Sequence, residues 1–349
     1  MESAAPRRRA ARFLAVLAVF YLLFTLALLL ALRQVGEANH GLALLLFAPP
    51  TLWLLPGLLL LPFALIWSWR SLPPLAAAAL VILGPFMGWQ LDRGAPAADA
   101  YAAPSLTLMT WNRGQHGGQT PLDFKRRQQP DLLVLQEAAQ RERAFARSSD
   151  YGDYAAYQCA GEHTLLSKFP ILESSLLPAG AARFVIDWNG RRIAVYSVHL
   201  RTPRDVLLSQ WKGGLFYGML GFPGTPWAER SAQYQVFWDG QLDAAAKILD
   251  AVRQDPLPAL IAGDFNSPHT GHIRHLFSRD LGDAHAEAGA GFGFTFPGRT
   301  RNPFSAGGPW LRIDYIFFSR HWSAMTCTTE AERASQHRAV AARLALTAP

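Results

Sequence analysis

Hydrophobic side chains dominate the first ninety residues and fall into three successive runs. Phe13–Leu32 reads FLAVLAVFYLLFTLALLLAL and contains no charged residue. The second run is Leu42–Trp69, interrupted by four prolines, and the third is Leu75–Leu91, with Pro85 inside it. About 20 apolar residues in a helix cross the ~30 Å hydrocarbon layer of a bilayer. The pattern therefore predicts three membrane spans, with buried core helices or a cleaved signal sequence as the alternatives.

Basic residues close to the first run set the expected orientation. Arg7, Arg8, Arg9 and Arg12 lie just before it, and arginines beside a span stay on the cytoplasmic side. Three crossings then place everything after Asp92 outside. A second run that crossed twice would reverse this, but each of its halves is shorter than the ~17 residues that a crossing needs. We therefore expect 42–69 to form one kinked helix within a multi-pass membrane domain of residues 1–92.

The hydrophobic pattern changes after a short Ala/Pro linker at residues 93–104. From there on, short alternating or continuously apolar runs predict strands, and longer amphipathic segments at 121–129 and 227–253 predict helices. Many strands with few helices favour two packed sheets flanked by helices, an α/β sandwich covering 105–349. The expected strands are Ser105–Trp111, Asp131–Leu135, Thr164–Ser167, Arg192–His199, Ala259–Ala262, Ile313–Phe318 and Ala339–Leu346.

Composition and charge narrow the choice of partners. The chain carries 33 basic and 26 acidic residues, a net charge of +7. Seven arginines and three acids lie in residues 1–93, so the remainder has 26 basic and 23 acidic side chains, or +3. A nucleic-acid surface usually needs a clustered basic stripe, so this balance argues only weakly for one. Cys159 and Cys327 are the two cysteines, and either a disulfide or two free thiols fits them.

Polar side chains recur where the predicted strands begin or end. Each has a structural explanation when taken alone, such as a helix cap, a turn or a buried histidine with satisfied hydrogen bonds. Taken together they indicate an active site, because loops at one edge of a sheet commonly carry functional residues. The seven residues are Asn112, Glu137, His199, Asp264, Asn266, Asp314 and His337.

The chemistry of this set favours a cation bound beside a phosphate. It contains three carboxylates, two amides and two imidazoles, without a nucleophile-elbow serine, a glycine-rich phosphate loop or a zinc-type His/Cys cluster. Oxygen ligands suit hard cations such as Mg²⁺ or Mn²⁺. Imidazole and amide groups can donate hydrogen bonds to phosphate oxygens as charge develops on them. The set therefore predicts metal-assisted phosphoester hydrolysis with water as the nucleophile.

An ordered series of motifs across residues 105–346 resembles the endonuclease/exonuclease/phosphatase superfamily, which includes DNase I, abasic-site endonucleases, neutral sphingomyelinases and inositol-polyphosphate phosphatases. The resemblance implies a DNase I-like four-layer α/β sandwich, here preceded by about three transmembrane helices, and a hydrolase of phosphoric ester bonds. The motifs are TWNRG (110–114), PDLLVLQE (130–137), LLSKFPI (165–171), VHL (198–200), GDFNSP (263–268), TFP (295–297), RIDYIFFS (312–319) and SQHRAV (335–340).

The resemblance also implies roles for individual residues. Glu137 would be the principal ligand of Mg²⁺ or Mn²⁺, with Asn112 beside it. Asp264 would orient or deprotonate the attacking water, and Asn266 would position that water and the phosphate. His199 would hydrogen-bond the phosphate or assist the leaving group.

The final histidine raises a separate question, because Gln336 stands where the family usually has an aspartate. In the family, the carboxylate that orients this histidine comes from the RIDYIF strand, and Asp314 occupies that position here. We therefore expect Asp314 to pair with His337 and the substitution at 336 to leave His337 functional. Gln336 would instead weaken a metal position, since losing a negative charge lowers cation affinity, so we expect one metal, bound more weakly than usual.

The membrane runs bring a lipid substrate into consideration. The architecture is similar to that of the teicoplanin-resistance membrane proteins of actinomycetes, a subgroup associated with lipid-linked pyrophosphate or cell-wall precursors. Residues 207–227 are rich in aromatic side chains and glycine, which predicts either a loop that dips into the membrane interface or a folded loop over the core. Arg201 and Arg204 would either clamp a phosphate or lie solvated at the surface.

Three functional classes remain open from the sequence. The first is a membrane-anchored, extracytoplasmic phosphoesterase that acts on a phosphodiester, phosphomonoester or pyrophosphate, with lipid-linked phosphates among its candidate substrates. The second is a metal-dependent nuclease, for which nucleic acid would be the partner. The third is a non-catalytic binding module. The lipid bilayer and a phosphate ester are the expected partners, and no protein partner is implied.

Overall fold

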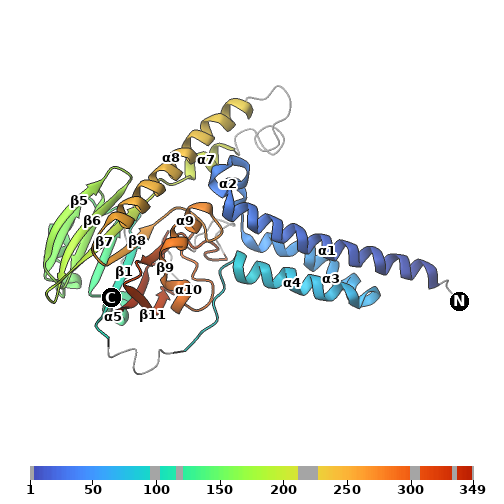
Figure 1. Ribbon diagram of the computed structural model, residues 1–349, viewed down its shortest axis with the longest axis horizontal. Helices are drawn as coiled ribbons and strands as arrows, with labels where there is room; N and C mark the ends of the chain where they lie inside the picture. Colours follow the sequence, from blue (N-terminus) through green and yellow to red (C-terminus); the bar gives the residue numbers. More distant parts are fainter. Residues whose placement is uncertain are drawn as a thin grey trace.

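The chain forms a bundle of apolar helices and a β-sandwich that lie end to end (Figure 1). The computed structural model describes residues 4–94, 103–114, 121–210, 227–298, 307–331 and 336–347. The N-terminus lies at the far end of the helical bundle, and the C-terminus lies in the sandwich. The central part of the predicted linker, residues 95–102, is outside the described residues.

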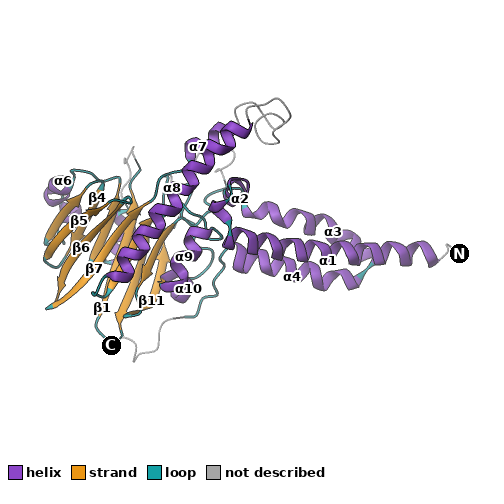
Figure 2. Cartoon of the chain, turned by 45° about the horizontal axis from the view of Figure 1, so that its top comes forward, coloured by secondary structure: helices purple, strands orange, loops and turns teal. Residues whose placement is uncertain are grey.

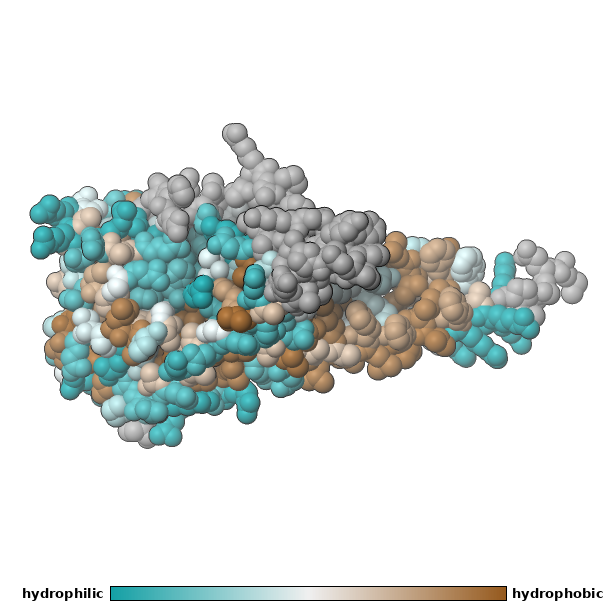
Figure 3. Space-filling view, turned by 90° about the horizontal axis from the view of Figure 1, so that it is seen from above, coloured by the Kyte–Doolittle hydropathy of each residue, from teal (hydrophilic) through white to brown (hydrophobic). Residues whose placement is uncertain are grey.

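Four helices make up the N-terminal part, α1 (Ala4–Gln34), α2 (His40–Leu46), α3 (Leu55–Trp67) and α4 (Leu72–Val81). Three helical segments are long and apolar enough to cross a membrane, namely Arg7–Gln34, Pro50–Trp67 and Trp69–Phe86. On the face shown in Figure 3, hydrophobic surface covers this part between a hydrophilic tip and the more hydrophilic sandwich. The three expected apolar helical segments are therefore present.

The second apolar run does not form the single kinked helix expected over 42–69. Helix α2 ends at Leu46, and the next helical turn starts only at Pro50. Pro49 and Pro50 cannot donate backbone hydrogen bonds, and a residue before proline avoids the helical conformation, so the helix breaks there. The third segment starts earlier than expected, at Trp69, and ends at Phe86 rather than at Leu91.

The described residues from 103 onward form two six-stranded mixed sheets and the helices that flank them. The first has the order β11 (Trp322–Thr329), β12 (Val340–Leu346), β1 (Ser105–Asn112), β2 (Leu132–Gln136), β4 (His163–Ser167), β3 (Ala156–Ala160). The second has the order β5 (Ile171–Leu177), β6 (Ala181–Trp188), β7 (Arg191–His199), β8 (Ala259–Asp264), β10 (Asp314–Phe318), β9 (Gly282–Asp283).

The sheets pack face to face, and helices cover their outer faces (Figure 2). Alternate side chains such as Leu108 and Leu260 meet in the core between the sheets. Helices α8 (Trp227–Gln254) and α9 (His272–Asp280) pack on the second sheet. Helices α5 (Leu122–Gln128) and α6 (Glu142–Arg147) pack on the first. Each fully buried aliphatic side chain contributes about 1.5–3 kcal/mol, and the resulting four layers confirm the expected sandwich.

The elements that the hydrophobic pattern did not predict are mostly edge strands and short helices. Strand β5 at the edge of the second sheet has five exposed residues in succession, so it carries no apolar run that would mark it. The edge strands β3, β9 and β11, the inner strand β6 and the helices α6, α9 and α10 (Ala284–Ala288) were likewise not predicted.

Two further expectations concern the cysteines and the aromatic segment. Cys159 and Cys327 are both free, and Cys327 is buried. Residues 207–210, expected to be irregular, belong to helix α7 (Arg204–Gln210). Residues 211–226 of the aromatic segment lie outside the described residues.

Candidate active site

The alternation of side chains along the strands brings four polar residues to one edge of the sandwich. Every second residue of β1, β7, β8 and β10 points between the sheets, and on each strand this series includes one polar residue at the strand end. These residues are Asn112, His199, Asp264 and Asp314. The register of the second sheet pairs His199 with Asp264 and Asp264 with Asp314, so the three are neighbours across adjacent strands.

Asp264 lies at the centre of this group and is buried. Its Oδ2 accepts hydrogen bonds from Nδ2 of Asn112 at 2.9 Å and from Nδ2 of Asn266 at 3.2 Å. Its Oδ1 accepts from the backbone N–H of Asn266 at 2.8 Å. Burial raises the pKa of Asp264, against the positive charges of His337 and His199, which lower it. The carboxylate is therefore held in a fixed orientation between the two sheets.

Two of the predicted residues have a left-handed backbone, which is uncommon for side chains other than glycine. Glu137 has φ 52° and Asn266 has φ 44°. Gln136, the last residue of β2, points between the sheets, so strand alternation alone would point Glu137 away from that space. The left-handed backbone of Glu137 changes the direction of the chain and brings its side chain to the pocket. Among the described residues, no donor reaches the buried Oε2 of Glu137, so this oxygen is available to a ligand.

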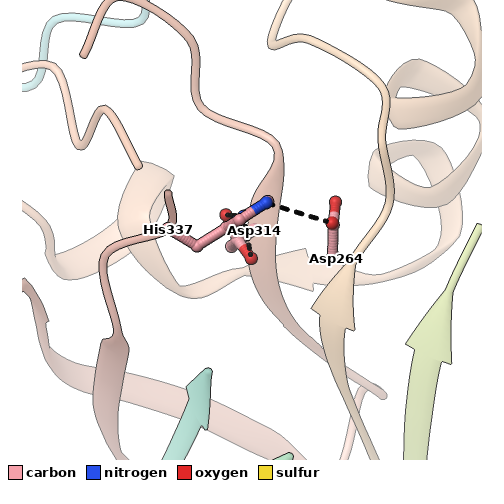
Figure 4. Close-up of side chains that lie close together, drawn as sticks. All are labelled: Asp264, Asp314 and His337. Carbon is pink, nitrogen blue, oxygen red and sulfur yellow. Dashed lines mark hydrogen bonds and ion pairs between the residues drawn. The ribbon is translucent and has the colours of Figure 1, made fainter. Parts of the chain in front are cut away.

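His337 and Asp314 form the predicted pair (Figure 4). Nδ1 of His337 lies 3.0 Å from Oδ2 of Asp314, and its Nε2 lies 3.7 Å from Oδ2 of Asp264. Burial lowers the pKa of His337, but the charges of Asp314 and Asp264 and the hydrogen bond to Asp314 outweigh it and raise the pKa to about 9. The ring is therefore protonated at neutral pH, with Nε2–H facing the other site residues.

A second histidine is oriented in the same way by a carboxylate that the sequence did not single out. Nδ1 of His199 lies 2.9 Å from Oε1 of Glu162, and Nε2 of His199 lies 3.8 Å from Oδ2 of Asp264. Burial lowers the pKa of His199, but the hydrogen bond to Glu162 and the nearby carboxylates raise it above its ordinary value. Glu162 lies in the turn between β3 and β4, and since β3 was not predicted, no sequence signal placed this turn beside β7.

One pocket of about 340 Å³ collects these side chains. Six of the seven residues predicted from strand ends line it, and Asp314 lies behind His337. Gln336 and Arg204 also line the pocket. Arg201 is not among the lining residues, because its guanidinium lies 5.2 Å from the centre of the Phe237 ring. Apolar lining comes from Phe47, Pro203, Leu207, Phe296 and Ile313.

Two groups of residues could hold a cation. Oε2 of Glu137, which no donor of the described residues reaches, and the side-chain carbonyl of Asn112 are oxygen ligands suited to Mg²⁺. The Asn112 Oδ1 accepts one hydrogen bond, from Gly114 N–H at 2.9 Å, and keeps a second lone pair. The other group is Asp264, Asp314 and His337, whose potential ligand atoms lie within 4.8 Å of one another. In this second group Nδ1 of His337 is already paired with Asp314 and Asp264 accepts hydrogen bonds from Asn112 and Asn266, so the oxygen ligands at Glu137 and Asn112 fit a hard cation better.

The match to a family model agrees with this architecture. A family model described as the endonuclease/exonuclease/phosphatase family matches residues 122–337. A family protein from Bacteroides thetaiotaomicron is similar in structure, with 17% identity over 70% of this chain and 99% of that chain and a TM-score of 0.48. The human nocturnin catalytic domain with bound sulfate shows 14% identity over 73% of this chain and 100% of that chain, with a TM-score of 0.45. No curated protein sequence matches the chain.

Proposed function

Because the chain belongs to the endonuclease/exonuclease/phosphatase family, we propose that it is a membrane-anchored, divalent-metal-dependent phosphoesterase. The observation that carries the proposal is the convergence of six residues from separate strands and loops on one 340 Å³ pocket. Members of this family are typically hydrolases of phosphoester bonds. The buried carboxylates and histidines of the pocket supply the acidic, basic and hydrogen-bonding groups that such a reaction needs.

The geometry supports a division of labour among the pocket residues. A cation held by Glu137 and Asn112 would polarise a phosphoryl oxygen and offset its negative charge. Asp264, fixed by its hydrogen bonds to Asn112 and Asn266, takes the proton of the attacking water. Asn266 orients that water and the phosphate.

The two histidines would donate hydrogen bonds to the phosphate of the substrate. The Nε2 atoms of His199 and His337 lie 3.8 and 3.7 Å from Oδ2 of Asp264, so both rings face one point beside the proposed base. Glu162 and Asp314 hold their Nδ1 atoms. The protonated His337 ring donates Nε2–H to phosphate oxygens as their charge grows, and His199 does the same in its protonated form. Arg204, at the rim, adds a donor for the same phosphate.

A lipid phosphate is the substrate class we favour, because part of the pocket wall comes from the membrane-proximal chain. Phe47 follows α2, between the first two apolar segments, and lines the pocket together with Leu207. Its ring stacks on Trp238, with ring centres 6.0 Å apart. The phosphate would lie at the histidines and the apolar part of the substrate against Phe47. This proposal agrees with the expected similarity to the teicoplanin-resistance membrane proteins.

The same arrangement supports an extracytoplasmic active site. The sandwich lies at the end of α1 opposite to Arg7, Arg8 and Arg12 (Figure 1), and three crossings separate it from the arginine-rich side. A cysteine introduced at the exposed Asp123, with Cys159 and Cys327 replaced by serine, tests this. We expect a membrane-impermeant maleimide to label it in intact cells. Labelling only after lysis would contradict the orientation.

A substrate panel tests the activity. The purified chain in detergent micelles, with Mg²⁺ or Mn²⁺, would be given a chromogenic phosphodiester, sphingomyelin, undecaprenyl pyrophosphate and plasmid DNA. We expect hydrolysis of a lipid phosphate, its loss in Glu137→Ala, and its retention in Asp123→Ala, which removes an exposed carboxylate on α5. Cleavage of DNA alone would identify a nuclease. No turnover of any substrate would favour a non-catalytic module.

The role of Phe47 has its own test. We expect Phe47→Ala to reduce kcat/KM for the lipid phosphate about tenfold and to leave the chromogenic phosphodiester unaffected, because one buried apolar contact contributes about 1–3 kcal/mol to discrimination. Phe63→Ala is the matched control, since Phe63 stacks on Trp67 in α3 and does not line the pocket. Equal losses on both substrates would contradict the lipid assignment.

A further inference from the structure

A buried glutamate joins the end of the first apolar helix to the loop that carries Asn266. Glu37 follows α1 and is completely buried. Its Oε1 accepts a hydrogen bond from Oγ of Ser267 at 2.5 Å. Its Oε2 accepts from the backbone N–H groups of His272 at 2.6 Å and Ile273 at 3.3 Å. The Glu37 carboxylate therefore accepts hydrogen bonds from two backbone N–H groups at the start of α9, which have no partner within the helix, and from one hydroxyl of the GDFNSP loop.

The connection between α1 and α9 also runs in the opposite direction. Nδ1 of His272, the first residue of α9, lies 2.9 Å from the carbonyl oxygen of Arg33 in the last turn of α1. Gly36 makes this approach possible: its φ is 37°, and a Cβ there would lie 2.8 Å from the backbone nitrogen of His272. The last turn of α1 thus accepts a hydrogen bond from α9, and the first turn of α9 donates two hydrogen bonds to Glu37, which follows α1.

Ser267 links Glu37 to the pocket, because it directly follows Asn266, which lines the pocket. Its backbone carbonyl accepts a hydrogen bond from the Tyr315 hydroxyl at 2.9 Å. Asn266 itself has a left-handed backbone and donates from Nδ2 to the carbonyl of Leu200 at 2.8 Å. The unusual backbone of Asn266 persists only if neighbouring contacts hold it, and the hydroxyl of Ser267 is one of the contacts beside it.

We propose that Glu37 is a positioning residue for the active site, which holds Asn266 in place through Ser267 and ties the catalytic loop to the first apolar helix. The inference rests on the proposed phosphoesterase function. Glu37 does not line the pocket, so it touches neither water nor phosphate and acts only through the loop. Activity thereby depends on a residue located between two apolar segments, far in sequence from the catalytic motifs.

The test is a double-mutant cycle of Glu37→Ala and Ser267→Ala in the full chain, with kcat measured per folded molecule. Ser267→Ala removes the hydroxyl but leaves Glu37 to cap α9. We expect each single variant to lower kcat about tenfold or more, since misplacing a group by about 1 Å can cost up to about 100-fold. The double variant should be no slower than the worse single variant. The metal concentration for half-maximal rate should stay unchanged. Wild-type kcat in Ser267→Ala, or effects that multiply, would overturn the proposal and leave Glu37 as a helix cap only.

A measurement that needs no substrate separates this inference from the proposed function. Hydrogen–deuterium exchange of peptides covering 263–268 should be about tenfold faster in both single variants, as expected for the loss of one hydrogen bond. Asp255→Asn is the control. This buried carboxylate accepts hydrogen bonds from Arg183 and Tyr196 at the end of α8, so we expect lower stability without faster exchange in the loop. Unchanged exchange in Ser267→Ala would refute the link between Glu37 and the loop, even if the enzyme is active. A wild type that hydrolyses no substrate, together with faster exchange in the two variants, would refute the proposed function alone.

Discussion

The pair of His337 and Asp314 makes the stability of the protein depend on pH in a way that Asp314→Asn should remove. Both side chains are buried, and Nδ1 of His337 lies 3.0 Å from Oδ2 of Asp314. The carboxylates of Asp314 and Asp264 raise the pKa of His337 to about 9, although burial alone would lower it. In the unfolded chain a histidine has a pKa of about 6.5, so folding strengthens proton binding at His337.

The size and the sign of the effect follow from these two values. The difference between about 6.5 and about 9 corresponds to roughly 3 kcal/mol, at 1.36 kcal/mol per pKa unit. Because the pKa is raised in the folded state, this stabilisation is fully present below pH ~6.5 and is lost as the pH rises through about 9. Asp314→Asn removes the main charge responsible. Because Asp264 still contributes in the variant, Asp314→Asn should be less stable than wild type by up to roughly 3 kcal/mol at pH 6, and the gap should narrow toward pH 9.5.

Denaturant unfolding in detergent, followed by tryptophan fluorescence, measures this gap between pH 6 and pH 9.5. EDTA in all samples keeps metal binding out of the comparison. Glu162→Gln is the matched control, since it disrupts the other histidine–carboxylate pair, in which the Glu162 side chain is 43% exposed. A half-exposed pair contributes at most about 1 kcal/mol, so this variant should show a small gap. A gap for Asp314→Asn that stays constant across the pH range would refute the reasoning.

Three further variants test the site and its supporting structure. Glu162→Gln should lower kcat/KM about 10- to 100-fold, because the neutral amide no longer fixes the tautomer and orientation of His199 as the carboxylate does. Full activity of this variant in a steady-state assay would contradict the role of Glu162. Gly263→Ala should prevent folding, judged by soluble yield and circular dichroism, because its φ is 147° and a Cβ would lie 1.9 Å from the carbonyl oxygen of Val198; Gly240→Ala, in open space on α8, is the control that should fold. Gln336→Asp should lower the Mg²⁺ concentration needed for half-maximal rate, because it adds a negative charge at the pocket rim; an unchanged concentration would show that position 336 takes no part in metal binding.

Local patterns in the sequence were enough to identify the apolar helices, the central strands and most of the pocket residues. Apolar runs mark buried strands and membrane-length helices because burial acts on each segment through its own periodicity. Asn112, His199, Asp264 and Asp314 stood out because a polar group at the end of a buried strand requires a partner. Their convergence follows from strand alternation combined with the register of neighbouring strands.

Only the tertiary structure identified Glu37, Phe47 and Glu162 as neighbours of the site. Glu37 and Glu162 are single acids in connecting segments, and Phe47 is one apolar residue within an apolar run, so no local pattern separates them from their surroundings. Their contacts join residues far apart in the chain, such as Glu37 with Ser267 and Glu162 with His199. Such contacts form only after the order of strands and the docking of α1 against α9 are established, and the periodicity of a single segment carries no information about either.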